Sequence, residues 1–143
     1  MTPVKVLVVD DSVVVRRLVT TVLAEDSDIE VMATAANGAI ALDKLAANLP
    51  DIVTLDMEMP VMDGLETLRE IRRRWPRLPV IMFSTLTAAG ATATLDALSA
   101  GANDFVAKPA NVGSVALGMQ AIREQLIPKV KVLAGRPTTR PTP

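Results

Sequence analysis

The sequence predicts an α/β protein built on a five-stranded parallel sheet with helices on both faces. Short apolar runs recur along the chain, segments with helical periodicity separate them, and the runs are apolar almost throughout instead of alternating. Continuous apolar strands are typical of parallel sheets, which are covered on both faces. Because parallel crossovers are right-handed, these repeated βα units favour a doubly wound sandwich.

The strands and the first two helices follow in order along the chain. Between the first two strands, Val15, Leu18 and Val22 form an apolar helical stripe. Residues 40–49 are rich in Ala and Leu and follow an Asn-Gly turn signal, which predicts the second helix. The predicted strands, of which the last has the weakest pattern, are residues 4–9, 29–34, 52–55, 80–83 and 104–107.

The third helix has an apolar stripe of Leu65, Leu68 and Ile71, and its arginines are expected to point outward. A phosphate or nucleic-acid patch is one interpretation of these arginines. However, cations in the last turn of a helix favour its dipole, and no aromatic residues interleave for base stacking. We therefore interpret the cluster as a solvated helix end, which comprises Arg69, Arg72, Arg73, Arg74 and Arg77.

The last two helices differ in their apolar content. Residues 88–100 are mainly Ala, Thr and Gly, with Leu95 and Leu98 as the only large anchors, so this helix should be the least firmly packed. Pro128 is expected to end or kink the final helix. The final helix has its stripe at Val112, Val115, Met119, Ile122 and Leu126.

One domain is expected from a chain of this length. Half of its residues are hydrophobic, which is enough to bury a core. We place the domain at residues 1–127. Residues 128–143 are predicted to be the helix end and a Pro/Thr-rich linker or tail, because this composition favours an extended chain.

The composition excludes several classes of function. The net charge of −1 argues against a direct nucleic-acid binder, which would have a basic excess. The chain has no Cys and no His, so it has no disulfide framework, thiolate site or His-based triad. No apolar run is long enough to span a membrane and the N-terminus has no signal-peptide pattern, so we expect a soluble cytoplasmic protein without membrane contact.

Acidic residues follow two strands of the predicted sheet. Asp10 and Asp11 follow the first strand and Asp56 ends the third. Ligands of open α/β sheets bind beyond the carboxyl ends of the strands, and in the flavodoxin-like order 2-1-3-4-5 the first and third strands are neighbours. The three carboxylates should therefore converge, and their mutual repulsion favours a hard divalent cation such as Mg²⁺.

Two further polar groups follow the fourth and fifth strands. Ser84 ends the fourth strand, and Lys108 with Pro109 follows the fifth. A hydroxyl and an ammonium at this edge supply donors for phosphoryl oxygens, and a carboxylate nucleophile there can form an aspartyl phosphate. Each feature alone is compatible with a helix cap, an ordinary turn or a solvated charge. Their joint position at successive strand ends favours a phospho-acceptor site.

These residues resemble a known family. Residues 8–12 (Val-Val-Asp-Asp-Ser) and 55–64 (Leu-Asp-Met-Glu-Met-Pro-Val-Met-Asp-Gly), with Ser84 and the Lys108–Pro109 pair, resemble a response-regulator receiver domain. The resemblance covers residues 4–127. It implies that Asp56 is the phospho-acceptor and that the domain adopts the flavodoxin-like receiver fold.

The resemblance also implies a Mg²⁺ site. Asp11 and Asp56 would bind the ion directly together with the backbone carbonyl of Glu58, and Asp10 would help through water. The Glu58 side chain places a negative group near the site entrance, at a position that tunes phosphoryl lifetime in this family. Leu86 occupies the other tuning position.

The switch residues are assigned from the same resemblance. Ser84 would bind a phosphoryl oxygen, Lys108 would pair with the phosphoryl group, and the bond before Pro109 would be cis. Phe105 stands where the family has its switching aromatic. It lacks the hydroxyl of a tyrosine, so it makes no hydrogen bond when it rotates inward.

A narrower resemblance concerns the output of the switch. Residues 54–60, 84–87 and 101–109 resemble the receiver half of chemotaxis protein-glutamate methylesterases. This resemblance implies a histidine kinase as phosphodonor and an attached or partner output domain, possibly the methylesterase. The chain has no His and no Gly-x-Ser-x-Gly motif, so we expect it to be no enzyme beyond its own phosphorylation and dephosphorylation, and either a fragment or a free-standing relative.

Two alternatives use the same residues differently. A haloacid-dehalogenase-like phosphatase also has a strand-end Asp nucleophile and Mg²⁺, but its Asp-x-Asp-x-Thr motif is not matched by Glu58 and Pro60. A pseudo-receiver would act as an interaction domain without phosphorylation, which the intact acidic set disfavours.

Overall fold

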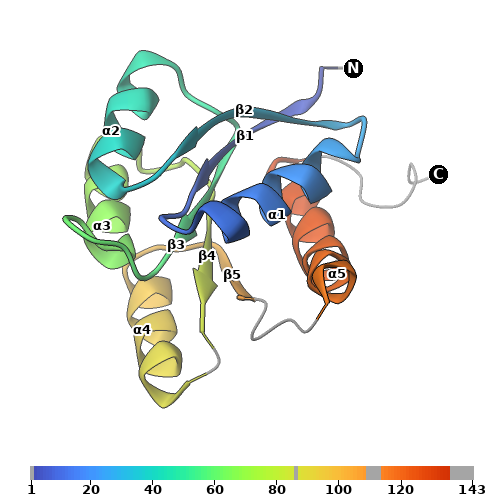
Figure 1. The fold of residues 1–143 in the computed structure, drawn as a ribbon. Helices are drawn as coiled ribbons and strands as arrows, with labels where there is room; N and C mark the ends of the chain where they lie inside the picture. Colours follow the sequence, from blue (N-terminus) through green and yellow to red (C-terminus); the bar gives the residue numbers. More distant parts are fainter. Residues whose placement is uncertain (1, 86, 109–113, 136–143) are drawn as a thin grey trace.

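The computed structural model describes residues 2–85, 87–108 and 114–135 and has the predicted architecture (Figure 1). A parallel sheet in the order β2-β1-β3-β4-β5 lies between helices on both faces, which confirms the fold class. The elements are β1 (Val4–Val9), α1 (Val13–Ala24), β2 (Ile29–Ala35), α2 (Gly38–Ala47), β3 (Ile52–Asp56), α3 (Gly64–Arg74), β4 (Val80–Ser84), α4 (Ala88–Ser99), β5 (Asp104–Ala107) and α5 (Val115–Leu133).

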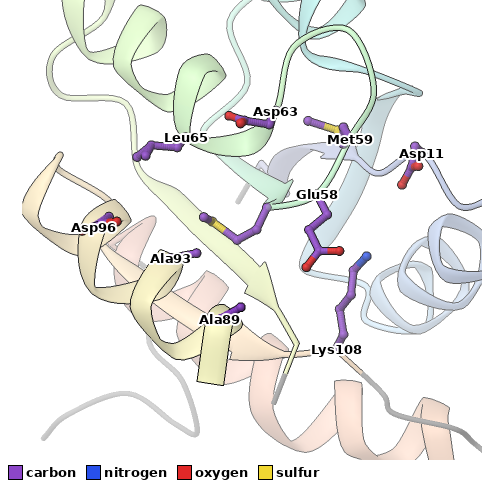
Figure 2. Close-up of a pocket in the computed structure, with 10 residues that line it drawn as sticks. Asp11, Glu58, Met59, Asp63, Leu65, Ala89, Ala93, Asp96 and Lys108 are labelled. Carbon is purple, nitrogen blue, oxygen red and sulfur yellow. The ribbon is translucent and has the colours of Figure 1, made fainter. Parts of the chain in front are cut away.

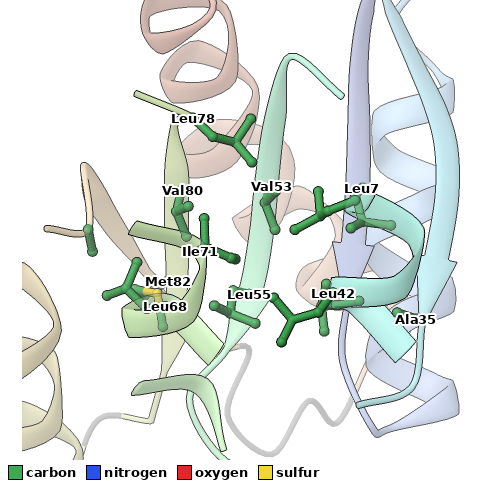
Figure 3. Close-up of a cluster of buried hydrophobic side chains, with 14 of the residues drawn as sticks. Leu7, Ala35, Leu42, Val53, Leu55, Leu68, Ile71, Leu78, Val80 and Met82 are labelled. Atoms are coloured by element: carbon green, nitrogen blue, oxygen red, sulfur yellow. The ribbon is translucent and has the colours of Figure 1, made fainter. Parts of the chain in front are cut away.

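The two faces of the sheet bury separate apolar clusters. Helices α2, α3 and α4 cover one face, where residues such as Leu42, Leu68 and Ile71 pack on Leu55 and Met82 (Figure 3). Helices α1 and α5 cover the other face, with a cluster of mainly Val, Ile and Leu. Because both faces are covered, the strands are apolar almost throughout, as the sequence pattern indicated.

Every helix begins at a polar N-cap whose side chain accepts a hydrogen bond from the first turn. These caps are Ser12, Asn37, Asp63, Thr87 and Ser114. Such caps satisfy amide groups that have no partner inside the helix. The cap of α3 is a complete capping box with Glu66, which fixes the start of this helix directly after the loop that follows β3.

Helix α4 packs through small residues, which corrects one prediction. Leu95 and Leu98 were expected to anchor it, but they are 65% and 37% exposed. The buried positions are Gly90, Thr94 and Ala97. Small side chains let the helix approach β4 closely, so its contact with the sheet depends on little apolar area.

Helix α5 continues through Pro128 to Leu133 instead of ending at the proline. Pro128 is exposed, and so is Glu124, whose carbonyl loses its amide partner. Leu126 and Val130 are buried on either side, and Lys131 forms an ion pair with Asp26 at 2.8 Å. The packing on both sides of the proline therefore keeps the helix intact. At its other end Val115 is 62% exposed, contrary to the predicted stripe, and Val112 lies outside the described residues.

Arg72 points inward, unlike the solvated cation that the sequence suggested. Its guanidinium donates to the backbone oxygens of Gly101 at 2.9 Å and Leu78 at 2.6 Å, and to Asn103 Oδ1 at 2.8 Å. It therefore joins the end of α3 to the loops before β4 and β5. Trp75 closes the same junction, where its backbone oxygen lies 3.4 Å from Arg72 Nη1.

Replacing Arg72 by Ala should lower the free energy of unfolding by roughly 2 kcal/mol, because part-buried carbonyls lose their charged donor. Arg73→Ala is the matched control. Its exposed ion pair with Glu70 is screened by solvent, so the loss of stability should be much smaller than for Arg72→Ala. Urea denaturation followed by circular dichroism measures both changes. Equal losses for the two variants would contradict the inward role of Arg72.

Among the described residues, no helix combines the length and the apolarity that crossing a bilayer requires.

Candidate functional site

The three predicted acidic residues meet at the carboxyl edge of the central strands. Val9 of β1 lies opposite Leu55 of β3, so the residues that follow, Asp10 and Asp56, are neighbours. The amide of Asp10 donates to the Ala35 oxygen at 3.0 Å, which extends the pairing of β1 with β2 by one residue. One carboxylate oxygen each from Asp10, Asp11 and Asp56 lies within 4.8 Å of the others.

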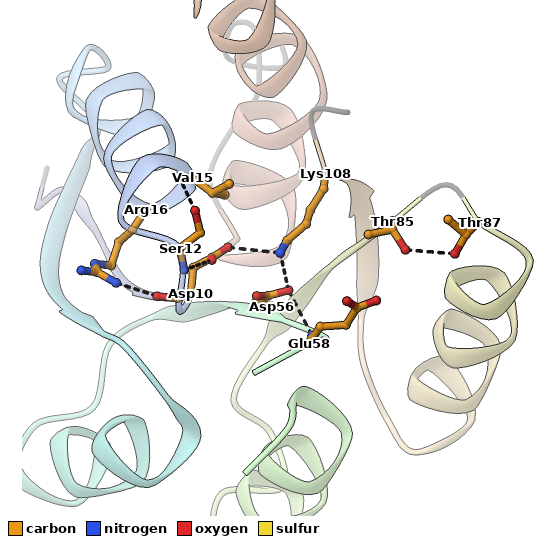
Figure 4. Close-up of polar contacts among 9 residues, drawn as sticks. All are labelled: Asp10, Ser12, Val15, Arg16, Asp56, Glu58, Thr85, Thr87 and Lys108. Carbon is orange, nitrogen blue, oxygen red and sulfur yellow. Dashed lines mark hydrogen bonds and ion pairs between the residues drawn. The ribbon is translucent and has the colours of Figure 1, made fainter. Parts of the chain in front are cut away.

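Asp56 is buried and only partly satisfied. Its Oδ1 accepts from Lys108 Nζ at 2.9 Å and from the Glu58 amide at 3.1 Å (Figure 4). Its Oδ2 is buried and has no hydrogen-bond partner among the described residues. Burial raises the pKa of Asp56 to about 7, with the Asp10 charge acting in the same direction and Lys108 opposing it.

Asp10 and Lys108 complete the charged centre. Asp10 Oδ1 accepts from the Ser12 amide at 2.8 Å, and Oδ2 lies 4.0 Å from Lys108 Nζ. Burial raises the pKa of Asp10. Burial acts to lower the pKa of Lys108, but the nearby carboxylates of Asp56 and Asp10 outweigh this effect and raise it. The ammonium is therefore held charged between two acidic residues.

The raised pKa of Asp56 makes metal-free stability depend on pH. The folded-state pKa of about 7 lies above the ordinary 3.8, so the folded chain binds the extra proton between these values. The associated stability is complete below the ordinary pKa and is lost as the pH rises through the folded one. From about pH 5 to pH 8, the wild-type chain should lose roughly 2 kcal/mol more than Asp56→Asn. Parallel urea-derived stability curves in EDTA for the two chains would contradict this.

The loop between β3 and α3 lies directly against Asp56. Gly64 begins α3, and a Cβ atom there would lie 2.2 Å from the Asp56 backbone oxygen, so only glycine allows this approach. The Gly64 amide donates to the Met57 oxygen at 2.9 Å. Val61 at the exposed tip has a φ of +71°, a left-handed conformation that is strained for a β-branched residue.

An open pocket of about 680 Å³ adjoins the acidic centre. Figure 2 shows its lining side chains coming from the loop after β3, from α4 and from the end of β5. Glu58 and Lys108, which both contact Asp56, are among the lining residues, as are Asp11 and, on α4, Asp96. The acidic centre is thus open to a small solute.

Among the described residues, neither of the predicted switch residues Ser84 and Phe105 forms a side-chain hydrogen bond with the acidic residues, although the Lys108 amide donates to the Ser84 backbone oxygen at 2.8 Å. Ser84 ends β4 and is 5% exposed, and its Oγ lies 2.8 Å from the Thr94 hydroxyl. Phe105 is 41% exposed, and Lys129 Nζ lies 5.3 Å from its ring centroid and donates to its backbone oxygen at 2.7 Å. Pro109 and Leu86 lie outside the described residues, so the predicted cis bond and the second tuning position stay predictions.

Two contacts of these switch residues had no signal in the sequence. Thr94 is one of many small residues in an Ala/Thr-rich helix, and Lys129 follows Pro128, where the helix was expected to end or kink. Neither belongs to a motif. Their positions follow from how α4 and α5 pack against the edge of the sheet.

The acidic centre fits a hard divalent cation. It offers carboxylate oxygens from three residues that lie within 4.8 Å of one another, which is an all-oxygen set of the kind that such cations prefer. The Asp11 side chain is exposed, so water can fill further coordination positions. The Asp cluster could therefore hold a metal ion such as Mg²⁺.

The fold and this acidic edge define the class of protein. A family model described as the response regulator receiver domain matches residues 6–117, and the chain belongs to this family. It is a receiver domain of the type found in CheB response regulators, which confirms the resemblance read from the sequence.

Full-length relatives are considerably longer than this chain. The protein-glutamate methylesterase/protein-glutamine glutaminase of Nocardioides sp. (strain ATCC BAA-499 / JS614) is 57% identical over 143 residues, which is 100% of this chain and 39% of the relative. The protein of the same description from Trichodesmium erythraeum is 53% identical over 132 residues, 92% of this chain and 38% of that protein. The chain thus spans just under two fifths of the length of each of these relatives.

Solved structures agree with the family assignment. The response regulator domain of Thermotoga maritima CheB matches with a TM-score of 0.82 and 35% identity, over 94% of this chain and 98% of that chain. A chain of the CheX-CheY-BeF3-Mg+2 complex from Borrelia burgdorferi matches with a TM-score of 0.70 and 34% identity, over 86% and 89%.

Proposed function

We propose that the chain is a phosphorylation switch that accepts a phosphoryl group on Asp56 from a histidine kinase. The observation that supports this most directly is the buried Asp56 Oδ2, which has no partner in the described part of the chain although Lys108 and the Glu58 amide satisfy Oδ1. A carboxylate held by one oxygen leaves the other free to attack. The absence of His from the chain agrees with a phosphohistidine donor on a partner.

Asp11, Asp56 and the backbone carbonyl of Glu58 would hold Mg²⁺, with Asp10 contributing through water. When bound, the ion supplies positive charge that neutralises phosphoryl oxygens. Asp10 also orients the start of α1 through the Ser12 amide, and Arg16 donates to the Asp10 backbone oxygen at 2.7 Å. These contacts keep the Asp10 carboxylate facing Asp56.

Lys108 and Ser84 would receive the phosphoryl oxygens. Lys108 Nζ is already at Asp56 Oδ1, so it can follow the phosphoryl group with a small movement. Ser84 ends β4, the strand next to β3, so it lies at the same edge of the sheet as Asp56. Phe105 lies on the neighbouring strand β5 and would respond to the movement of Ser84. Its side chain is exposed, so it would rotate from this outward position to an inward one.

The output is proposed from the relatives. The matched Nocardioides and Trichodesmium proteins are described as protein-glutamate methylesterases/protein-glutamine glutaminases, and this chain corresponds to part of their length. We propose that phosphorylation of this domain controls such a methylesterase domain in the whole protein, in a two-component chemotaxis system.

Labelling with a small phosphodonor tests the acceptor. The chain is incubated with acetyl phosphate and Mg²⁺, the product is reduced with borohydride, and modified residues are located by peptide mass spectrometry. Modification should fall on Asp56 and should require Mg²⁺. Labelling at another residue, or continuous turnover of p-nitrophenyl phosphate, would contradict the switch and favour a phosphatase.

A further inference from the structure

A pair of buried hydroxyls connects the end of β4 to helix α4. Thr94 is 7% exposed, and its Oγ1 lies 2.8 Å from Ser84 Oγ and also 2.8 Å from the backbone oxygen of Gly90. The contact with Gly90 is the ordinary bond of a helical threonine to the carbonyl one turn earlier. The contact with Ser84 joins the helix to a residue of the proposed phosphoryl site.

Each hydroxyl has one proton, so a hydrogen bond between the two hydroxyls can run in only two directions. In the first, Ser84 donates to Thr94 and Thr94 donates to the Gly90 oxygen, which uses both protons inside the protein. In the second, Thr94 donates to Ser84 Oγ, and the Ser84 proton is free to point elsewhere. The second direction removes a hydrogen bond from the Gly90 oxygen.

Gly90 lies in the first turn of α4, where the helix meets the strand end most closely. A Cβ atom at Gly90 would lie 2.2 Å from the Thr85 backbone oxygen, so the backbones are in direct contact there. The Gly90 amide donates to the cap residue Thr87 at 2.9 Å. A change in the bonding of the Gly90 oxygen therefore acts on the start of α4, which few large side chains anchor.

We propose that Thr94 is a positioning residue that holds the Ser84 hydroxyl in the unphosphorylated state and reverses its hydrogen bond when Ser84 donates to a phosphoryl oxygen. The reversal couples phosphorylation to the first turn of α4, because Thr94 then no longer donates to the Gly90 oxygen. It requires no displacement of the Ser84 backbone. This inference rests on the proposed function, because it takes Ser84 as a phosphoryl ligand.

The proposal predicts an increase in affinity when the Thr94 hydroxyl is removed. In Thr94→Val, the unphosphorylated state loses both bonds that form in the first direction, whereas the phosphoryl-bound state loses only the bond from Thr94 to Ser84. The net value of one hydrogen bond corresponds to about fivefold tighter binding of a phosphoryl analogue. A side chain that is merely structural would not strengthen binding.

Beryllofluoride binding to the whole chain at saturating Mg²⁺, measured by calorimetry, tests this. Thr94→Val should bind about fivefold more tightly than wild type, while Thr94→Ser and the exposed control Thr92→Val should match wild type. In a Ser84→Ala background, Thr94→Val should have no further effect. Equal affinities for Thr94→Val and Thr92→Val, or an increase that persists without Ser84, would overturn the proposal.

A second measurement separates this proposal from the proposed function. Urea unfolding of the ligand-free single and double variants of Ser84 and Thr94 should be non-additive, because the two hydroxyls share a bond. Additive losses of unfolding free energy would overturn the proposed role of Thr94 even if beryllofluoride binds normally. If the wild-type chain fails to bind beryllofluoride, the proposed function fails and the inference falls with it.

Discussion

An Asp56→Asn chain should gain no phosphoryl group from acetyl phosphate under conditions in which the wild-type chain is labelled. The carboxamide lacks the anionic oxygen that attacks phosphorus, and its nitrogen cannot replace the unpartnered Oδ2. No other described carboxylate combines burial, a lysine at 2.9 Å and a free oxygen. Intact-protein mass spectrometry measures the gain directly.

Asp43→Asn is the matched control for this variant. Asp43 is an exposed carboxylate on α2, so the same substitution there should leave labelling unchanged. Labelling of Asp56→Asn at the wild-type rate would show that another group accepts the phosphoryl group. Circular dichroism of both variants establishes that any loss is chemical and does not come from unfolding.

Replacing Lys108 by Met should change metal binding and phosphoryl transfer in opposite directions. Its ammonium lies 2.9 Å from Asp56 and 4.0 Å from Asp10, so it competes with a cation for the same carboxylates. Without it, Mg²⁺ should bind more tightly, on the order of tenfold, because a like charge is removed from the site. Phosphoryl transfer should become roughly a hundredfold slower, because a preorganised donor for the developing charge is lost.

Mg²⁺ titration by calorimetry and the initial rate of labelling by acetyl phosphate measure the two effects. Lys5→Met serves as the control, because Lys5 is an exposed lysine at the start of the sheet. A damaged fold would lower both quantities together. Weaker Mg²⁺ binding by Lys108→Met would therefore contradict the competition that the geometry indicates.

The fold class could be predicted from the sequence because its pattern allows few solutions. Strands that are apolar on both sides need helices on both faces, and right-handed crossovers leave few strand orders. Within this order the chain direction alone brings Asp10 next to Asp56, since β1 and β3 are neighbours. The acidic centre could therefore be predicted from the residue types at the ends of the strands.

The details that sequence could not provide depend on packing. Arg72 was expected to be solvated because periodicity describes the direction of a helical position and not the reach of a long side chain, which here bends back to backbone oxygens. Leu95 and Leu98 were expected to be core because hydrophobicity was taken as burial, but α4 approaches the sheet through Gly90, Thr94 and Ala97. The sequence left open whether Pro128 ends or kinks the final helix, and packing on both sides of the proline holds this helix through to Leu133.

The junction that Arg72 and Trp75 close has an optical consequence. Trp75 is the only tryptophan of the chain and ends α3, whose first residue lies beside Asp56. A helix of this length places the backbone of Trp75 about 16 Å from the start of α3, toward the other end of the sheet from the acidic centre. The Arg74 guanidinium lies over the indole, with its Cζ atom 5.9 Å from the centroid of the Trp75 ring. Intrinsic fluorescence should therefore report opening of this junction while remaining nearly silent to events at Asp56.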